Sequence, residues 1–465
     1  MYLSAQIDAV ANALPFRVVG QVQSISGLTI EANDLALPVG ALCGIRSFGG
    51  RESVAEVIGF RHDCTLLMSL GSTGGISRGD KIENITAAPS INCTHRLLGR
   101  VLNGFGQPID GKGSLPMGQM RRLDSRCTDP MDRRHIDAPI STSVRAIDAL
   151  HTCGMGQRMG IFSGPGVGKS TLLSQIARHT SADITVVALI GERGREVQDF
   201  LVKSLGPEGL KRCVVVVSTS DEPALLRVRS TKVACTIAEY FRDQGKNVLL
   251  LMDSLTRLCH AQRQIGLAAH EPPATKGFPP SVFSMLPEIL ERAGKTTQGS
   301  ITGFYTVLVE GDDFNEPIPD AVKGIVDGHL WLTRALANRG HYPALDVLQS
   351  ISRVRGDVTS PQQLRQAKRL LSLAAVYQDI EDMVNIGAYT PGANPEFDLA
   401  VQVHAKILQF LQQESGSPVT LEQSRKQLED LSNWIDQIEK VIRAQAQKGA
   451  VRPAGNAGSS ASAAK

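Results

Sequence analysis

A glycine-rich segment follows a short apolar run near position 160, and it constrains the fold more than any other feature. The run Met159-Gly160-Ile161-Phe162 suits a buried strand, and the residues from Leu172 onward have the apolar spacing of a helix packed on a sheet. Between them lies Ser163-Gly164-Pro165-Gly166-Val167-Gly168-Lys169-Ser170-Thr171. A strand, a glycine-rich turn and a helix N-terminus in this order form a cradle of backbone N–H groups that binds phosphate. The segment predicts a P-loop that binds a nucleoside triphosphate.

Two polar side chains of this loop have predicted roles. We expect Lys169 to reach the β- and γ-phosphates and the Ser170 hydroxyl to bind Mg²⁺. The usual pattern begins with Gly or Ala, where this chain has Ser163. Because Ser is small, we expect the turn to form. The alternative is a glycine loop without a ligand, which the flanking strand and helix disfavour.

Length and composition indicate an ordinary globular protein with several domains. The 465 residues are sufficient for two or three domains, and a net charge of +3 does not indicate nucleic acid or an acidic membrane as a partner. The eight cysteines contain no CxxC pair, which favours reduced thiols in the cytoplasm. No secretory signal or bilayer-spanning apolar run is evident, so we expect any membrane association to come through partners.

The spacing of apolar residues divides the chain into five segments. Residues 1–14 predict a small amphipathic helix, which either caps the next domain or docks a partner. Residues 15–88 contain short β-like runs broken by glycines, typical of a small antiparallel β-barrel. Residues 89–357 begin with a turn-rich connecting segment and continue as alternating strands and helices. We expect residues 358–447 to be helical and residues 448–465, rich in Ala, Gly and Ser, to be a disordered tail.

Continuous apolar runs mark the strands of the P-loop domain and predict a mostly parallel sheet covered on both faces. The expected strands are Gln157–Phe162, Ile184–Ile190, Cys213–Ser218, Asn247–Met252 and Ile301–Val309. A long helix is expected at Pro223–Arg242, closed by Gly245.

The barrel and the last helix each allow two interpretations. Small barrels often bind nucleic acid through stacked aromatics, but the aromatics here are limited to Phe16, Phe48 and Phe60 without a basic cluster. We therefore favour a structural or ring-forming barrel and expect no nucleic acid partner. In the last helix, one apolar face favours core packing over a coiled-coil docking seam. That face carries Leu421, Leu428, Leu431, Ile435, Ile438 and Ile442.

Two carboxylates follow predicted strands directly. Asp253 ends the run 247–252 and Glu192 comes after the run 184–190, so both lie at the sheet edge that carries the P-loop. Asp253 is predicted to complete the Mg²⁺ site with Ser170, the alternative being a helix N-cap. Glu192 is predicted to orient and polarise the water that attacks the γ-phosphate.

The charges around Glu192 allow a catalytic and a structural interpretation. Arg193 is placed to steady the γ-phosphate, and Glu196 to hold the surrounding arginines. On spacing alone, the same cluster also suits a surface ion-pair network. The pattern assigns no chemistry to Arg353 or Tyr342: the default interpretation is a structural salt bridge for Arg353 and a core aromatic for Tyr342.

These motifs together resemble the catalytic subunits of rotary ATPases, and most closely the ATPases of type III protein export. Residues 343–352, PALDVLQSIS, match the signature of ATP synthase α and β chains. The segment 191–196, GERGRE, resembles the catalytic-glutamate loop of the export enzymes. Residues 271–283, EPPATKGFPPSVF, followed by ERAG at 291–294, resemble the export ATPases and differ from the ATP synthase β subunit. The resemblance covers residues 15–445.

The resemblance implies an N-terminal β-barrel, a RecA-like P-loop domain and a C-terminal helical domain, assembled as a homohexameric ring with ATP and Mg²⁺ between subunits. By position, Glu192 matches the catalytic carboxylate, Arg353 the arginine finger that enters the neighbour's site, and Tyr342 the aromatic that packs on adenine. Ser163 and Pro165 depart from the family pattern, and Pro165 removes one N–H from the loop.

The family also implies partners and a place in the cell. The implied partners are a stator-like regulator at the N-terminus, a coiled-coil stalk protein, export chaperones and substrates, and the membrane export gate. The implied location is the cytoplasm, peripherally on the export apparatus of the inner membrane.

The predicted function is hydrolysis of ATP to release and unfold substrates of type III export, with the flagellar system favoured over a virulence-type injection system. A second possibility is a non-catalytic nucleotide-binding ring subunit, which the presence of Glu192 disfavours. A third is a hexameric RNA translocase resembling Rho, which the barrel composition and the Pro-rich segment 271–283 disfavour.

Overall fold

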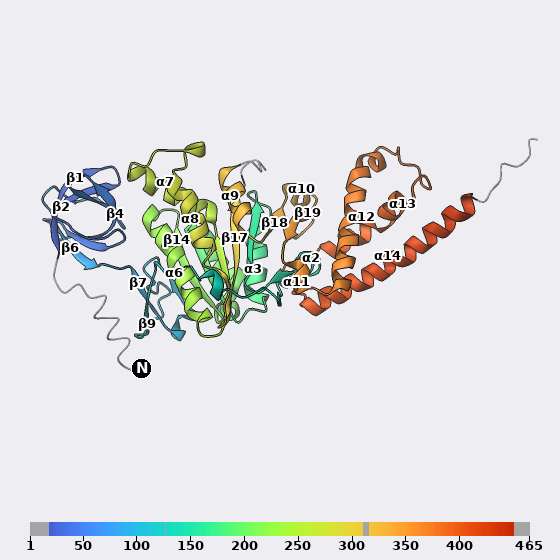
Figure 1. Ribbon diagram of the computed structural model, residues 1–465, viewed down its shortest axis with the longest axis horizontal. Helices are drawn as coiled ribbons and strands as arrows, with labels where there is room; N and C mark the ends of the chain where they lie inside the picture. The colour runs from blue at the N-terminus through green and yellow to red at the C-terminus, as the bar shows by residue number, and fades with distance from the viewer. Residues whose placement is uncertain (1–17, 126, 310–315, 451–465) are drawn as a thin grey trace, which may run out of the picture.

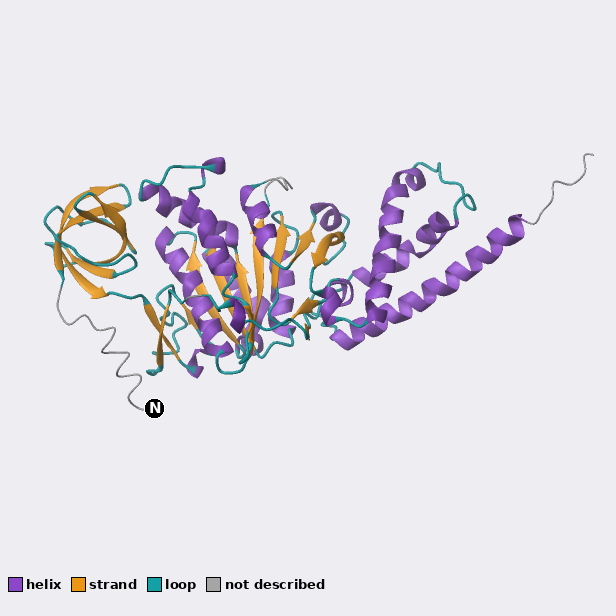
Figure 2. Ribbon diagram, in the orientation of Figure 1, coloured by secondary structure: helices purple, strands orange, loops and turns teal. Residues whose placement is uncertain are grey.

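The computed structural model describes residues 18–125, 127–309 and 316–450. A small barrel, a central sheet covered by helices and a helical domain follow one another along the long axis of the molecule (Figures 1 and 2). This is the predicted multidomain α/β fold. The helix expected at 1–14 lies outside the described residues. The tail expected from residue 448 overlaps the end of the last helix, which continues to Ala450, and the remainder lies outside the described residues.

The N-terminal domain is a closed barrel of six antiparallel strands in the order β1-β2-β5-β4-β3-β6. Its strands are β1 Val19–Ser26, β2 Thr29–Asn33, β3 Leu42–Arg46, β4 Glu52–Arg61, β5 Cys64–Ser69 and β6 Lys81–Thr86. Apolar side chains at alternate positions, such as Ile30, Ile45 and Val57, point inward and form a separate core. Closure leaves no unpaired sheet edge, so the prediction of a barrel is confirmed.

The connecting segment crosses from the barrel to the central sheet. It contains a small antiparallel pair, β7 Ser90–Cys93 with β9 Gln119–Arg122, and the short strand β8 Val101–Leu102, which joins the edge of the central sheet. Two single-turn helices, η1 His95–Leu97 and η2 Pro130–Asp132, and a second short pair, β10 Pro139–Ile140 with β11 Cys153–Gly154, complete it. The barrel rests on the next domain through an ion pair of 3.6 Å between Glu56 and Arg229.

The central sheet runs in the order β19-β18-β12-β17-β15-β13-β14-β8, with β16 paired to β17. Its remaining strands are β12 Arg158–Ser163, β13 Ile184–Glu192, β14 Cys213–Thr219, β15 Asn247–Asp253, β16 Gly294–Lys295, β17 Ser300–Leu308, β18 Gly328–Leu332 and β19 Leu345–Ser352. All pairs are parallel except β18 with β19 and β16 with β17. The five expected strands are therefore present within two residues at each end, and the sheet is mostly parallel as predicted.

Helices cover both faces of this sheet (Figure 2). On one face lie α6 Ala224–Arg242, α7 Leu255–Ala268, α8 Pro280–Leu290 and α9 Pro317–Ile325, with the short turn η4 Thr275–Gly277 between α7 and α8. On the other lie α2 Arg145–Leu150, α3 Lys169–His179, α4 Gly194–Asp199, the π-helix η3 Phe200–Leu205 and α5 Gly206–Leu210. In β13, Val186 and Ala188 pack on the first face while Val187 and Leu189 pack on the second. Burial on both faces explains the continuous apolar run.

The C-terminal domain consists of three long helices, α12 Pro361–Asn385, α13 Pro395–Leu411 and α14 Leu421–Ala450, preceded by the short helices α10 Arg334–Asn338 and α11 Arg355–Val358. Leu428, Leu431, Ile435 and Ile442 of α14 are buried in the same core as α2 and α13. The interpretation of this stripe as core packing is thus confirmed. None of the described helices combines the length and the apolar character needed to cross a membrane.

Candidate active site

The P-loop connects the end of β12, at Ser163, to the start of α3, at Lys169. Gly166 and Gly168 have φ angles of +78° and +89°, a region that residues with a Cβ rarely adopt. Gly168 caps α3 without a side chain, so the first amide groups of this helix are free of a capping side chain. Such N–H groups, together with the positive end of the helix dipole, bind anions. The loop therefore has the geometry of a phosphate site.

The two unusual residues of the loop are accommodated in different ways. Pro165 is exposed at the turn between Gly164 and Gly166. Proline followed by a glycine with positive φ is the combination that a type II turn requires, so Pro165 fits the loop. Ser163 is fully buried in the sheet, and its hydroxyl finds no hydrogen-bond partner among the described residues. The turn forms with Ser163 in place, as expected.

Asp253 lies at the C-terminal end of β15, beside the P-loop. Its Oδ1 accepts hydrogen bonds from Lys169 Nζ at 2.5 Å and from Thr306 Oγ1 at 2.8 Å. Ser254, not Asp253, caps the next helix, because the Ser254 hydroxyl accepts a hydrogen bond from the backbone N–H of Arg257. The alternative interpretation of Asp253 as a helix cap is therefore wrong, and its carboxylate faces the phosphate site.

Asp253, Ser170 and Glu192 line one cavity of about 240 Å³, the catalytic cavity. A hydroxyl and a carboxylate at the mouth of a phosphate cradle suit Mg²⁺, which takes oxygen ligands and shares them with substrate phosphates and water. Without a nucleotide, the Lys169 ammonium satisfies the Asp253 carboxylate. A triphosphate with its cation offers each of these two groups a new partner of opposite charge.

Glu192 is, with Asp253, a buried carboxylate of the catalytic cavity, and only 6% of the residue is exposed. Burial raises its pKa to about 7, with further increases from the nearby Asp253 charge and a hydrogen bond to Glu196. Lys169 and Arg257 act in the opposite direction. A carboxyl group with this pKa exchanges its proton near neutral pH, as general base chemistry requires.

Arg257 was not found from the sequence. It lies in the first turn of α7, four residues after Asp253, and its Nε donates a 3.1 Å hydrogen bond to Glu192 Oε1. The sequence did carry one signal for it: a basic residue lies one helical turn after Asp253, the carboxylate at the end of the strand. The contact orients the Glu192 carboxylate and partly offsets its loss of hydration.

Arg193 and Glu196 differ from Glu192 in their surroundings. Their side chains are 76% and 52% exposed, and Arg193 Nε lies 4.0 Å from Glu196 Oε1. The two side chains form an exposed ion pair, although Glu196 also lines the catalytic cavity and bonds to Glu192. An exposed Arg193 remains free to approach a bound phosphate from the side of the solvent.

Gly191 sets the direction in which Glu192 points. Its φ is +71°, and a Cβ at this position would come within 2.9 Å of the Arg257 side chain. We expect Gly191→Ala to lower kcat at least tenfold and to reduce stability by about 1–2 kcal/mol, because it strains the backbone and displaces Arg257. Steady-state ATPase assays and thermal unfolding check both effects.

Gly194→Ala is the matched control for Gly191→Ala. A Cβ at Gly194 meets nothing within 4 Å, and its φ is not positive. Near-normal kcat is expected for this control. If Gly191→Ala were equally active, the placement of Glu192 would not depend on this glycine.

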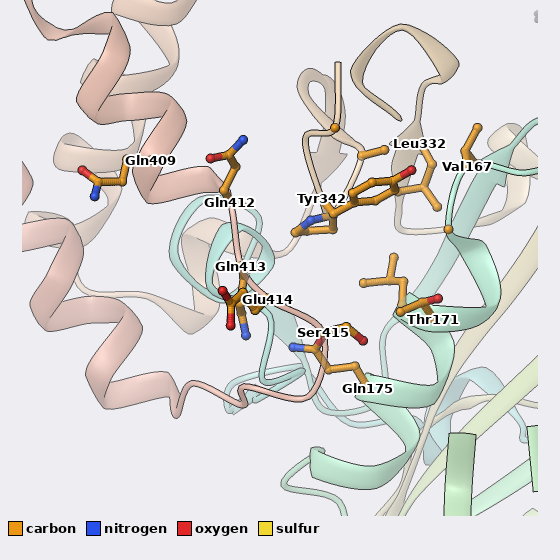
Figure 3. Close-up of a pocket in the computed structure, with 15 residues that line it drawn as sticks. Val167, Thr171, Gln175, Leu332, Tyr342, Gln409, Gln412, Gln413, Glu414 and Ser415 are labelled. Atoms are coloured by element: carbon orange, nitrogen blue, oxygen red, sulfur yellow. The ribbon is translucent and has the colours of Figure 1, made fainter. Parts of the chain in front are cut away.

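Tyr342 lines a second cavity of about 650 Å³, the base cavity (Figure 3). It is 47% exposed, so the alternative of a core aromatic is wrong. Its ring lies over Gly168, 3.4 Å from the position that a Cβ would occupy there. Val167 and Thr171 of the P-loop also line this cavity. An aromatic ring beside the phosphate cradle is suited to stack on a nucleobase.

The far wall of the base cavity comes from the C-terminal domain, which sequence reasoning did not assign to the site. Residues 409 and 412–415, at the end of α13 and in the loop after it, complete the lining. The backbone N–H of Gln413 donates a 2.9 Å hydrogen bond to the Tyr342 carbonyl. This segment has no glycine-rich or charged motif, so the sequence carried no local signal for it.

Arg353 does not join either cavity. It follows β19, which is antiparallel to its neighbour, so that Ser352 pairs with Gly328 at the start of β18. Arg353 N–H bonds to Asp327 O, which is level with Arg158, five residues before the P-loop begins at Ser163. Arg353 therefore lies at the sheet edge opposite to the P-loop, about 17 Å along the strand direction. Its side chain is exposed and makes no hydrogen bond or ion pair with the described part of the chain. Within one chain it is too far away to act on its own phosphate site.

Fold and site together define a P-loop nucleoside triphosphate hydrolase of the ATP synthase type. Three family models match in order: the ATP synthase alpha/beta beta-barrel domain over residues 22–85, its nucleotide-binding domain over 143–352, and the T3SS EscN ATPase C-terminal domain over 359–430.

Similar proteins narrow the class further. The chain is 47% identical over 435 residues to the flagellum-specific ATP synthase of Bacillus subtilis, covering 93% of this chain and 99% of that protein. It is 46% identical over 405 residues to a type 3 secretion system ATPase of Sinorhizobium fredii, covering 87% and 90%. The assembled ATPase EscN of the enteropathogenic E. coli type III secretion system superposes with a TM-score of 0.84 at 44% identity, covering 89% of this chain and 100% of that chain. The chain belongs to the family of type III export ATPases, which includes the flagellum-specific ATP synthases. It is an ATP hydrolase and binds ATP.

Proposed function

We propose that the chain hydrolyses ATP at the interfaces of a homohexameric ring and so drives type III protein export, in the flagellar system. The observation that carries the proposal is the division of the site. Glu192 and Asp253 line one cavity and Lys169 pairs with Asp253, whereas Arg353 lies at the opposite sheet edge. A neighbouring subunit in a ring supplies the missing arginine. The related EscN forms an assembled structure and has been solved with its central stalk EscO.

The reaction proceeds by displacement at the γ-phosphorus. A water oxygen forms a bond to phosphorus while the bond to the β–γ bridging oxygen breaks, and the products are ADP and phosphate. Glu192 orients the water and accepts its proton. Lys169, the loop N–H groups and Arg193 hold the phosphate oxygens, and the neighbour's Arg353 stabilises the charge of the transition state. Ser170 and Asp253 would hold Mg²⁺, which would neutralise part of the negative charge of the phosphates.

Binding and partners follow from the same arrangement. Tyr342 stacks on the adenine, and residues 164–171 surround the phosphates. The proposed partners are a stator-like regulator at the N-terminal segment, a coiled-coil stalk on the C-terminal side, chaperone–substrate complexes and the membrane export gate. The ring works in the cytoplasm, peripherally on the inner-membrane export apparatus. A flagellar role is supported by flagellum-specific relatives at 47% and 51% identity. An injection system is the second candidate because its ATPases reach 46% and 47% identity.

The dependence of activity on concentration tests the shared site. We expect the ATPase activity per subunit to rise steeply with protein concentration, in parallel with the hexamer fraction measured by light scattering. The reason is that an isolated subunit lacks the arginine of its neighbour. Full activity per subunit in dilute samples that contain only monomers would contradict the proposal. Flagellar genes beside the coding gene would separate the two export systems.

The raised pKa of Glu192 predicts the pH profile. Below about pH 7 the carboxyl is protonated and cannot accept a proton, so kcat/KM is expected to rise as the pH increases through about 7. Because the Arg257 charge lowers this pKa, Arg257→Gln is expected to move the midpoint to higher pH. Measurements of kcat/KM across the neutral range check both statements. An unchanged midpoint in Arg257→Gln would show that another group controls the profile.

A further inference from the structure

Two glutamine side chains at the base cavity bind the same backbone carbonyl. Ser143 O accepts hydrogen bonds from Gln175 Nε2 at 3.0 Å and from Gln413 Nε2 at 2.9 Å. Ser143 has a φ of +61°, unusual for a residue with a side chain, and its hydroxyl donates to the His179 carbonyl at 2.7 Å. The carbonyl is thus held at a fixed place just before α2.

This carbonyl determines how both amides are oriented. A backbone oxygen only accepts, so each glutamine must turn its nitrogen toward Ser143 and its oxygen away. Gln413 is then fully engaged, because its Oε1 accepts the Arg145 backbone N–H at 2.8 Å and its Nε2 also donates to Ser417 O at 2.7 Å. Gln175 differs: its Oε1 receives no hydrogen bond from the residues that the structure describes, and the residue is half-buried. One oriented acceptor remains at the wall of the cavity.

The position of Gln175 relates this acceptor to the nucleotide. Gln175 lies on α3, one turn after Thr171, so its distance from the P-loop is set by the helix. Figure 3 shows Gln175 and Ser415 across the cavity from Tyr342. A base stacked on Tyr342 therefore presents an edge toward this wall.

We propose that the side-chain oxygen of Gln175 accepts a hydrogen bond from the 6-amino group of adenine and so selects ATP over 6-oxo purine nucleotides. Adenine carries a donor at position 6, whereas guanine and hypoxanthine carry an oxygen there. In a 6-oxo purine, the oxygen at position 6 would face the Gln175 oxygen. The two acceptors would repel each other and neither would have a donor, so the site rejects the analogue strongly. Ser143 prevents the amide from turning to present its nitrogen instead. The assignment rests on the proposed placement of the base beside Tyr342.

The test compares ATP with inosine triphosphate, which differs in having a 6-oxo group. Gln175→Met keeps length and helix propensity while removing the acceptor. We expect the variant to raise KM for ATP roughly three- to tenfold and to lower KM for inosine triphosphate, because the repulsion of its 6-oxo group is removed. The kcat for ATP is expected to change by less than about twofold, because the base lies away from the reacting phosphate. Calorimetric Kd values for ADP and inosine diphosphate measure the preference for adenine over the 6-oxo base independently of turnover.

Two further variants make the result unambiguous. Gln402→Met, an exposed glutamine on α13 outside both cavities, is the matched control and should keep the wild-type preference. Tyr342→Ala should weaken both nucleotides alike, because stacking does not depend on position 6. If Tyr342→Ala weakens both but Gln175→Met keeps the wild-type ratio, the Gln175 assignment is wrong while the base site stands. If Tyr342→Ala affects neither nucleotide, the base lies elsewhere and both assignments fail.

Discussion

Replacing Glu192 by Gln is expected to reduce ATP hydrolysis by about 10²–10⁴-fold, to a rate close to background. The amide retains the size of the side chain and still accepts a hydrogen bond from Arg257, but it cannot take a proton from water. Because Lys169 pairs with Asp253 and not with Glu192, the substitution leaves the ion pair at the phosphate site in place. ATP binding and ring assembly are therefore expected to persist.

A phosphate-release assay measures the expected loss of hydrolysis, and equilibrium nucleotide binding measures the expected retention of ATP binding. The matched control is Glu208→Gln on α5, where the carboxylate is 79% exposed and pairs only with Lys211. It should hydrolyse ATP normally. Near-normal turnover in Glu192→Gln would show that another group accepts the proton and that Glu192 is not catalytic.

The residues that the sequence placed together at the phosphate site share one property: they belong to short continuous motifs. The P-loop, Asp253 and Glu192 each follow an apolar run that is buried on both faces, and parallel strands bring their ends to one sheet edge. That rule needs no knowledge of side-chain contacts. It placed Lys169, Asp253 and Glu192 together, and the structure shows all three at the phosphate site.

The residues that sequence reasoning missed depend on tertiary contacts. Arg257 reaches Glu192 only because α7 returns across the sheet, and residues 412–415 meet the P-loop only because α13 ends beside α2. The edge strands β18 and β19 were also not predicted as strands. β19 alternates between buried and exposed positions, so it lacks the continuous apolar run that marked the central strands.

The roles of Tyr342 and Arg353 could be predicted only in part. Neither has a local pattern that distinguishes function from packing, and the family resemblance alone suggested their roles. The structure adds a physical reason for each. Half of Tyr342 is open to a cavity beside Gly168, and β19 reverses direction so that Arg353 ends up far from its own P-loop.

Replacing Arg353 by Ala is expected to lower kcat by about 10³-fold or more while monomers bind ATP normally, because the lost guanidinium acts on the neighbour's transition state. Its exposed side chain makes no hydrogen bond or ion pair with the described residues, so truncation should not destabilise the subunit. Arg339→Ala, an exposed arginine paired with Glu381, is the matched control and should remain active.

Mixing two inactive variants tests the action between subunits directly. In rings that contain Arg353→Ala and Glu192→Gln subunits, some interfaces combine an intact Glu192 from one subunit with an intact Arg353 from the next. Such mixtures are expected to recover ATPase activity that neither variant shows alone, in proportion to the fraction of mixed interfaces. If both residues acted within one chain, every subunit would lack one of them and no mixture could recover. Persistent inactivity in rings shown by mass to contain both variants would therefore place the arginine finger elsewhere, and full activity of Arg353→Ala alone would exclude it outright.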